Sequence, residues 1–297
     1  MSDKARQDET VQQAIRDLFI GSIPERGEEL TSLWNELDPV FQLVPDIHED
    51  ERVIMDAGAF RFVRFNHRVV RSFWIGAFAA WEAYRAFAES EDTQAVDLAH
   101  FRLLVVAFEA NIQNDQSDAH SLPTGIPEPG TLPNADREPQ ARAASELAII
   151  AVAWAMLHEI RHIRHQREGT SAPPLENTPE ARQARHEEEF SCDDFATKFI
   201  LEHVNRFAEK SGDDPALVRR KRAMAIYFAL FALVLLAKDR WDASNTHPSV
   251  QDRINAVCLL MKDNRDELPE AIACTVFKAL RRLWPAAPMI EIVGDSA

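Results

Sequence analysis

The sequence predicts a mainly helical protein, with an α+β arrangement left open. The 297 residues include only 9 Gly and 2 Tyr, and Thr is also scarce. Long stretches are instead rich in Ala and other residues that favour helices over strands. A chain of this length can bury a sizeable core in one large domain or in two smaller ones. No internal repeat stands out.

The first part of the chain, residues 1–114, is expected to form a helical region. A β-hairpin is one interpretation of residues 52–66, where Phe60 and Phe62 alternate with polar residues after Gly58. The other interpretation makes this segment the start of the aromatic-rich helix that follows it. The amino-acid composition of the segment fits both interpretations.

Residues 115–141 hold several Pro and Gly residues and are expected to be a linker or lid. Residues 142–297 then form a helical catalytic region. Its helices are expected near residues 138–168, 179–210, 215–239, 248–263 and 269–284.

The pattern His158-Glu159-Ile160-Arg161-His162 carries the clearest chemical signal. His158 and His162 are four residues apart, so both imidazoles leave one face of a helix and can reach one Zn²⁺ ion. Glu159 projects beside that position, where it can take a proton from a water. The almost wholly apolar residues 147–157 precede the motif, so the helix is expected to be buried when it reaches His158.

A zinc site of this kind needs a third protein ligand. Glu189 is the first candidate and Glu188 the next, on a helix expected to begin near Pro179 with Thr178 as its N-cap. Asp193 lies four residues after Glu189, so it could accept the other N–H of a ligand histidine as an outer-shell partner.

A second continuation takes the third ligand from the residues directly after the motif. In the metzincin pattern a Gly turns the chain and a ligand follows. Here His165 stands at the Gly position and Glu168 at the ligand position, while Gly169 comes too late for that turn. This continuation is the weaker one.

Two further segments resemble known motifs. The residues from Glu189 to Ala196 (EFSCDDFA) resemble the E-F-x-A-D-x-x-A signature of the gluzincins of the HtpX and CAAX prenyl protease group. Thr246-His247-Pro248, followed by Arg253-Ile254, resembles their T-H-P-x-x-x-x-R-I element. The resemblance implies a gluzincin-type zinc metallopeptidase with a zincin-like helical core. Arg161 and Cys192 depart from it, since that group usually has Gly and Ala there, and paired membrane helices are not evident.

The length, the single motif cassette and the helical N-terminal half also resemble the Lit-type phage-exclusion peptidases. That resemblance implies a bacterial cytoplasmic endopeptidase whose substrate is elongation factor Tu. The motifs cover residues 147–254 and leave the first 140 or so residues unexplained.

His247 is a candidate catalytic residue beside Pro248, which suits the first turn of a helix. A neutral imidazole there could donate a hydrogen bond to an oxyanion. The alternative is a helix-capping role without chemistry. Arg253 is a second candidate for this task, although structural ion pairing suits it better, and Tyr227 is a third.

The formal charge of −15 argues against nucleic acid as a partner. Cys192, Cys258 and Cys274 show no paired spacing, which favours reduced thiols in a cytoplasmic protein, with Cys192 as a packing residue. The basic run 219–222 reads as the flank of a helix. The apolar run 223–237 is short for a membrane span and favours a core helix, with inner-membrane association as the alternative.

The expected function is that of a zinc-dependent metalloendopeptidase, a hydrolase acting on a protein or peptide. Two alternatives stay open. A di-iron carboxylate bundle would pair Glu159 and His162 with a second such pair, for which Asp97 and His100 are an imperfect match. A degenerate zincin would keep the fold and serve as a binding or regulatory module.

Overall fold

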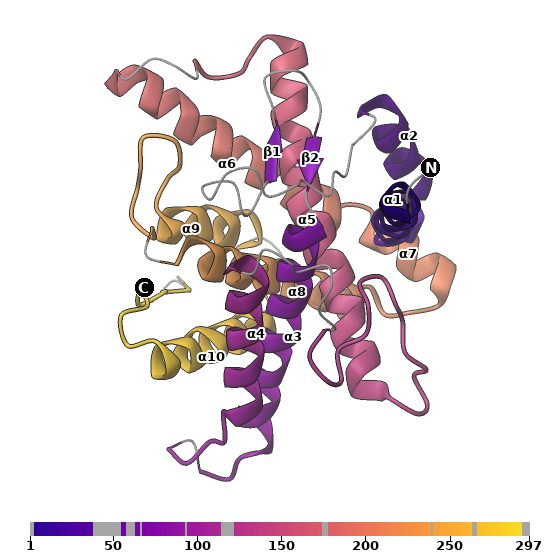
Figure 1. Ribbon diagram of the computed structural model, residues 1–297, viewed down its shortest axis with the longest axis vertical. Coiled ribbons are helices and arrows are strands. Elements are labelled where there is room, and N and C mark those ends of the chain that lie inside the picture. Colours follow the sequence, from indigo (N-terminus) through magenta and orange to yellow (C-terminus); the bar gives the residue numbers. More distant parts are fainter. Residues whose placement is uncertain are drawn as a thin grey trace.

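Helices account for almost all of the regular structure in the computed structural model (Figure 1). It describes residues 3–37, 55–57, 63–65, 67–92, 94–113, 122–173, 178–238, 240–262 and 266–292. The elements in chain order are α1 (Asp3–Gly21), the 3₁₀ turn η1 (Pro24–Arg26), α2 (Gly27–Leu37), β1 (Met55–Ala57), β2 (Val63–Phe65), α3 (His67–Glu89), α4 (Ala99–Gln113), α5 (Pro139–Glu168), α6 (Pro179–Leu201), α7 (Val204–Ser211), α8 (Pro215–Ala237), α9 (Val250–Leu260) and α10 (Glu267–Leu283). The mainly helical class is confirmed.

The small sheet lies where the sequence allowed a hairpin. β1 and β2 pair antiparallel, with Met55 opposite Phe65 and Ala57 opposite Val63. The residues between the strands, including Gly58, Phe60 and Phe62, lie outside the described residues. The pair of strands sits beside α5 (Figure 1).

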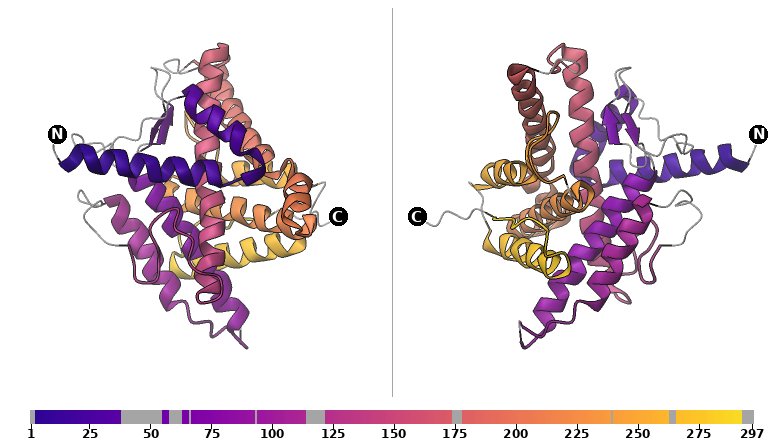
Figure 2. Two further views of the ribbon diagram at one scale, coloured as in Figure 1. Left: turned by 90° about the vertical axis from the view of Figure 1, so that its right-hand side faces the viewer. Right: turned by 60° about the vertical axis from the view of Figure 1, so that its left-hand side comes forward.

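Helix α5 is the central element, and it runs through the middle of the molecule in each view (Figures 1 and 2). It packs against α3, α6 and α8 and also contacts α1. Its apolar run 147–157 is buried, because neighbours cover it on several sides. The same hydrophobic core takes residues from every α-helix except α7, whose Val204 and Ala208 form a small cluster with Val218, so the N-terminal and C-terminal parts share the core. The proposed division at residues 115–141 stays a prediction.

Close packing of α3 on α8 depends on Gly76. A Cβ atom at this position would lie 2.9 Å from the Cβ of Ala232 on α8, which is shorter than a normal contact. The apolar run 223–237 falls in α8, and its residues from Ala225 to Leu235 are mostly buried in the core. By length and composition, α5 is the one described helix that could cross a membrane, and 83% of the relevant window is buried inside the protein.

The ends of α5 and α6 follow the sequence signals. Gly169 ends α5 in the left-handed conformation, with φ of 72°. Thr178 caps α6, because its side chain accepts a hydrogen bond from the backbone N–H of Ala181. These two boundaries match the expected ones.

The predicted single helix over residues 179–210 is wrong. α6 ends at Leu201, and His203 adopts a left-handed conformation (φ 58°) before α7 begins. Two arginines from distant segments bind the last carbonyls of α6: Arg26 donates to Phe199 O and Arg222 donates to Ile200 O, each at 2.8 Å. Because these donors come from tertiary contacts, the local sequence gives no sign of the break.

Candidate metal site

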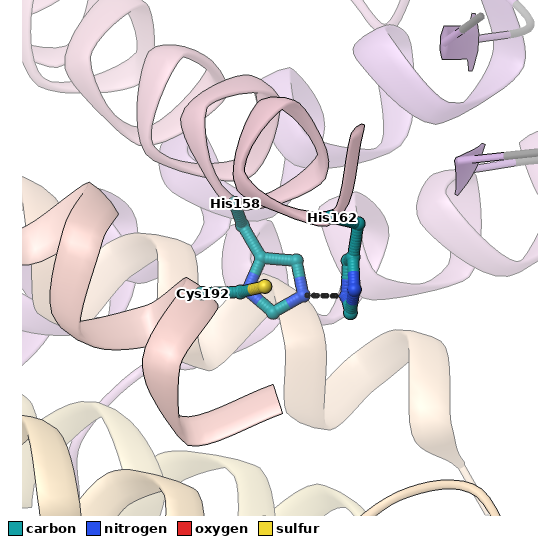
Figure 3. Close-up of side chains that lie close together, drawn as sticks. All are labelled: His158, His162 and Cys192. Atoms are coloured by element: carbon teal, nitrogen blue, oxygen red, sulfur yellow. Dashed lines mark hydrogen bonds between the residues drawn. The ribbon is translucent and has the colours of Figure 1, made fainter. Parts of the chain in front are cut away.

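The two motif histidines leave one face of α5 and converge (Figure 3). The Nε2 atoms of His158 and His162 are 3.3 Å apart. His158 is 2% exposed, and the side chain of His162 is 15% exposed. The four-residue spacing on a helix explains this convergence.

Each of these imidazoles is held by a carboxylate of α6. Nδ1 of His158 lies 2.9 Å from Asp193 Oδ1, and Nδ1 of His162 lies 2.8 Å from Glu188 Oε1. A carboxylate accepts a hydrogen bond, so each Nδ1 carries the donated proton. In the neutral imidazole the Nε2 lone pair is then free to face the centre of the site. Glu188 is itself fixed, because its Oε2 accepts from Ala172 N at 2.6 Å.

Glu189 completes a triangle with the two histidines. Its Oε2 lies 3.4 Å from Nε2 of His158, and its Oε1 lies 3.3 Å from Nε2 of His162. Oε2 is buried and accepts no hydrogen bond within the described part of the chain. Ligands about 2.0–2.1 Å from a tetrahedral metal ion are about 3.3 Å from one another. The spacing of these nitrogen and oxygen atoms therefore fits a metal ion.

Cys192 is a fourth donor that sequence reasoning assigned to packing. Its Sγ and a ring nitrogen of each histidine all lie within 4.8 Å of one another (Figure 3). The residue is fully buried, and burial raises the pKa of its thiol to about 12. Cys192 follows Glu189 by three residues on α6, so both point toward α5. His158, His162 and Cys192 form a buried group that could bind a metal, with Glu189 as the alternative third donor.

The electrostatics of the site favour a cation. Burial alone would lower the pKa of His158, but its hydrogen bond to Asp193 and the nearby carboxylate of Glu189 outweigh burial, and the pKa is raised. The pKa of His162 is raised for similar reasons, with burial again opposed by its hydrogen-bonding neighbours, Glu188 among them. These negative groups stabilise positive charge between the two rings.

A buried ion pair supports the outer side of the site. Arg253 of α9 donates from Nη2 to Asp193 Oδ1 at 2.6 Å and from Nε to Oδ2 at 2.8 Å. Both side chains are almost completely buried. Such a two-point pair fixes the carboxylate that in turn orients His158. Its geometry matches the structural role considered for Arg253.

Glu159 and His247 lie beside the triangle that Glu189 forms with the two histidines. Glu159 is buried, and its Oε1 is 3.9 Å from Nε2 of His158. Nε2 of His247 is 3.5 Å from Glu189 Oε1, while its side chain is 59% exposed. α9 begins at Val250, two residues later than predicted, and its cap is Ser249. His247 therefore reaches the exposed edge of the site and does not cap that helix.

Other candidates lie elsewhere. Glu168 forms a surface ion pair with Arg161, which removes it from the third-ligand position of the metzincin pattern. His100 bonds Glu82 of α3, and Asp97 accepts from the backbone of Ala99, so the second pair of a di-iron site is not at this centre. Tyr227 contacts Cys258 in the core.

The comparisons with known proteins point to one family. The family model described as Peptidase U49 matches residues 63–273, a range that includes every residue of the site. The Escherichia coli (strain K12) protein named "Cell death peptidase" is 32% identical over 157 residues, which is 52% of this chain and 46% of that protein. The chain thus aligns with about half the length of this curated relative. No solved structure matches the chain.

Proposed function

Because the chain belongs to the Peptidase U49 family, we propose that it is a zinc-dependent metalloendopeptidase of the gluzincin type. The observation that carries this proposal is the triangle formed by the Nε2 atoms of His158 and His162 and the carboxylate of Glu189, with sides of 3.3–3.4 Å. The outer partners Asp193 and Glu188 hold the rings so that both Nε2 atoms face this point.

His158, His162 and Glu189 would hold the zinc ion. Two imidazole nitrogens and one carboxylate oxygen form a known ligand set for catalytic zinc, which leaves a further position for water or substrate. Oε2 of Glu189 supports this assignment over Cys192, because this buried oxygen accepts no hydrogen bond from the described residues, and its cationic neighbour, Nη1 of Arg253, is 3.4 Å away. A metal ion beside the two rings would give it a direct partner. Zinc there would lower the pKa of a water and polarise a peptide carbonyl.

Glu159 is the proposed general base. It lies beside His158 and is buried, so its carboxylate can accept the proton of the attacking water and then deliver it to the leaving amine. His247 reaches the same region from the exposed side, where its ring N–H can donate to the developing oxyanion. A peptide would therefore approach along the side that His247 occupies.

For the biological role we propose phage exclusion by cleavage of elongation factor Tu. Support comes from the resemblance of the motif cassette to the Lit-type peptidases and from the similarity to the Escherichia coli Cell death peptidase. The aligned part covers 46% of that protein, so the substrate rests on likeness alone.

The test compares wild-type protein with Glu159→Gln, a change that keeps the shape of the side chain and removes the base. Both forms are expressed in bacteria, and new protein N-termini are quantified by mass spectrometry. We expect N-termini that appear with the wild type and are absent with the variant, including one inside elongation factor Tu. General acid–base groups contribute about 10²–10⁴-fold, so cleavage by the variant should fall by at least 100-fold.

Each outcome decides a part of the proposal. Identical N-termini in both samples, with zinc bound in both, would contradict peptidase activity and favour the degenerate zincin that serves as a binding module. Glu159-dependent cleavage of other proteins but not of elongation factor Tu would leave the peptidase and overturn the proposed substrate.

A further inference from the structure

A hollow lies at the C-terminal end of α6 and is lined by residues of α6, α7, α8 and the end of α9. Its volume is 480 Å³, within the usual range for small-molecule sites. None of the metal-site residues lines it. Thr197, which does line it, accepts a hydrogen bond from Trp154 Nε1, so the hollow is built on the same helix pair as the metal site.

Four consecutive basic residues, 219–222, lie near the start of α8 and differ in their ion pairing. Three of the cations pair with acids from three different segments: Arg220 with Asp266, Lys221 with Glu146, and Arg222 with Glu25. Arg219 lines the hollow, is only partly exposed, and makes no ion pair with any described residue. Arg219, the member of this run without an ion pair to a described residue, is therefore the one that lines the hollow.

A second cation faces the same space. Arg206 of α7 lines the hollow and has no ion-pair partner in the described ranges. The acid Glu202 also lines the hollow, and its Oε2 accepts from Arg26 at 3.1 Å. Arg206 is exposed and Arg219 is half-buried, and neither charge is neutralised by an ion pair with a described residue. They create a local positive field that suits an anion.

The backbone at this place is also unusual. His203, another residue of the lining, has φ of 58°, a conformation that costs energy for a residue with a side chain. Its neighbours hold it there, since α6 ends just before it and α7 begins just after it. This left-handed residue separates α6 from α7 at the hollow.

Leu201, Ala223, Leu260 and Met261 give the hollow an apolar side, from α6, α8 and the end of α9. Lys198, which also lines the hollow, is paired with Asp194. We propose that this pocket binds a small molecule in which one anionic head group, a carboxylate or a phosphate, is joined to a short apolar body. Arg219 and Arg206 bind the head group, and the apolar side covers the body.

The test is isothermal titration of the full-length protein with four probes below their micelle concentrations. Octanoate and octyl phosphate carry both features, octan-1-ol carries only the apolar body, and inorganic phosphate carries only the charge. At least one of the first two should bind at one site, about tenfold or more tighter than octanol and inorganic phosphate. Whichever of octanoate and octyl phosphate binds tighter identifies the head group.

Two variants locate the binding. Arg219→Gln should weaken it about tenfold or more, and Leu260→Glu, at the partly exposed rim, should abolish it by repelling the anion. Arg281→Gln, an exposed residue of α10, is the matched control and should bind like the wild type. Circular dichroism checks that each variant is folded. No saturable binding of either amphiphile, or equal binding by wild type and Arg219→Gln, would overturn the proposal.

Discussion

His158 and His162 direct their Nε2 atoms at each other across 3.3 Å, although Nδ1 of each ring is already bonded to a carboxylate. When both imidazoles are neutral, their Nε2 lone pairs face each other with no proton between them, and the raised pKa of each ring shows that the site favours a positive charge there. A cation removes that repulsion. A metal ion also satisfies the buried oxygen of Glu189, which accepts no hydrogen bond in the described structure.

Replacement of Glu188 by Gln should weaken metal binding without unfolding the protein. Glu188 fixes the ring of His162 through Nδ1, and loss of such an outer partner typically costs about 10–100-fold in metal affinity. Competition with a chromogenic chelator measures the affinity. Glu187→Gln is the matched control, since Glu187 is an exposed neighbour that bonds Gln183. Equal loss in both variants would contradict the assigned role of Glu188.

The third protein ligand can be identified with cobalt in place of zinc. We expect Cys192→Ala to keep the metal and Glu189→Gln to weaken its binding by more than about 100-fold, because a charged ligand is lost directly. Coordination by Cys192 would instead give a sulfur-to-metal charge-transfer band in the wild type that vanishes in Cys192→Ala. That band would overturn the assignment of Glu189.

Loss of Arg253 should destabilise the fold. Arg253→Met removes the guanidinium group from the buried Asp193 carboxylate, and breaking a buried pair costs about 3–5 kcal/mol. Urea denaturation of the metal-free proteins measures the free energy of unfolding. Arg281→Met serves as the exposed control and should stay within about 0.5 kcal/mol of the wild type. If Arg253→Met also stayed within about 0.5 kcal/mol of the wild type, the ion pair would contribute little to the free energy of unfolding.

The contribution of Glu146 to stability should depend on pH. Burial would raise its pKa, but Lys221 and Arg142 outweigh burial and lower the pKa below its usual 4.5. A lowered carboxylate pKa stabilises the folded state above the unfolded pKa, and this stabilisation is lost as the pH falls through the folded value. Glu146→Gln should therefore be less stable than wild type at pH 7, and the gap should close below pH 4.5.

Urea denaturation at a series of pH values checks this prediction. Other carboxylates titrate in both proteins, so the difference between them isolates Glu146. Glu209→Gln on the surface of α7 is the control and should show no such trend. A gap that widens as the pH falls would contradict the lowered pKa.

Much of the site could be predicted because its parts are local. The spacing of His158 and His162, the apolar run before them, and the stop at Gly169 all act within one helix. The cap at Thr178 and the four-residue step from Glu189 to Asp193 act within the next. Helical periodicity alone then decides which side chains share a face.

Other features depend on contacts between segments that are far apart in the sequence, so the local sequence does not predict them. The sequence made Glu188 the second candidate for the third ligand, yet the docking of α6 on α5 brings it to Nδ1 of His162. Cys192 lies on the same broad face as Glu189, and only the depth of that docking places its sulfur near both rings. The break at His203 depends on Arg26 and Arg222, which come from other parts of the chain.

The metal content of the purified protein, measured by elemental analysis beside His158→Ala, tests most directly whether the motif histidines hold a zinc ion. We expect about one zinc per wild-type chain and far less in the variant, since a ligand is lost. Two irons per chain, or no bound metal even after zinc is supplied, would contradict the zinc site.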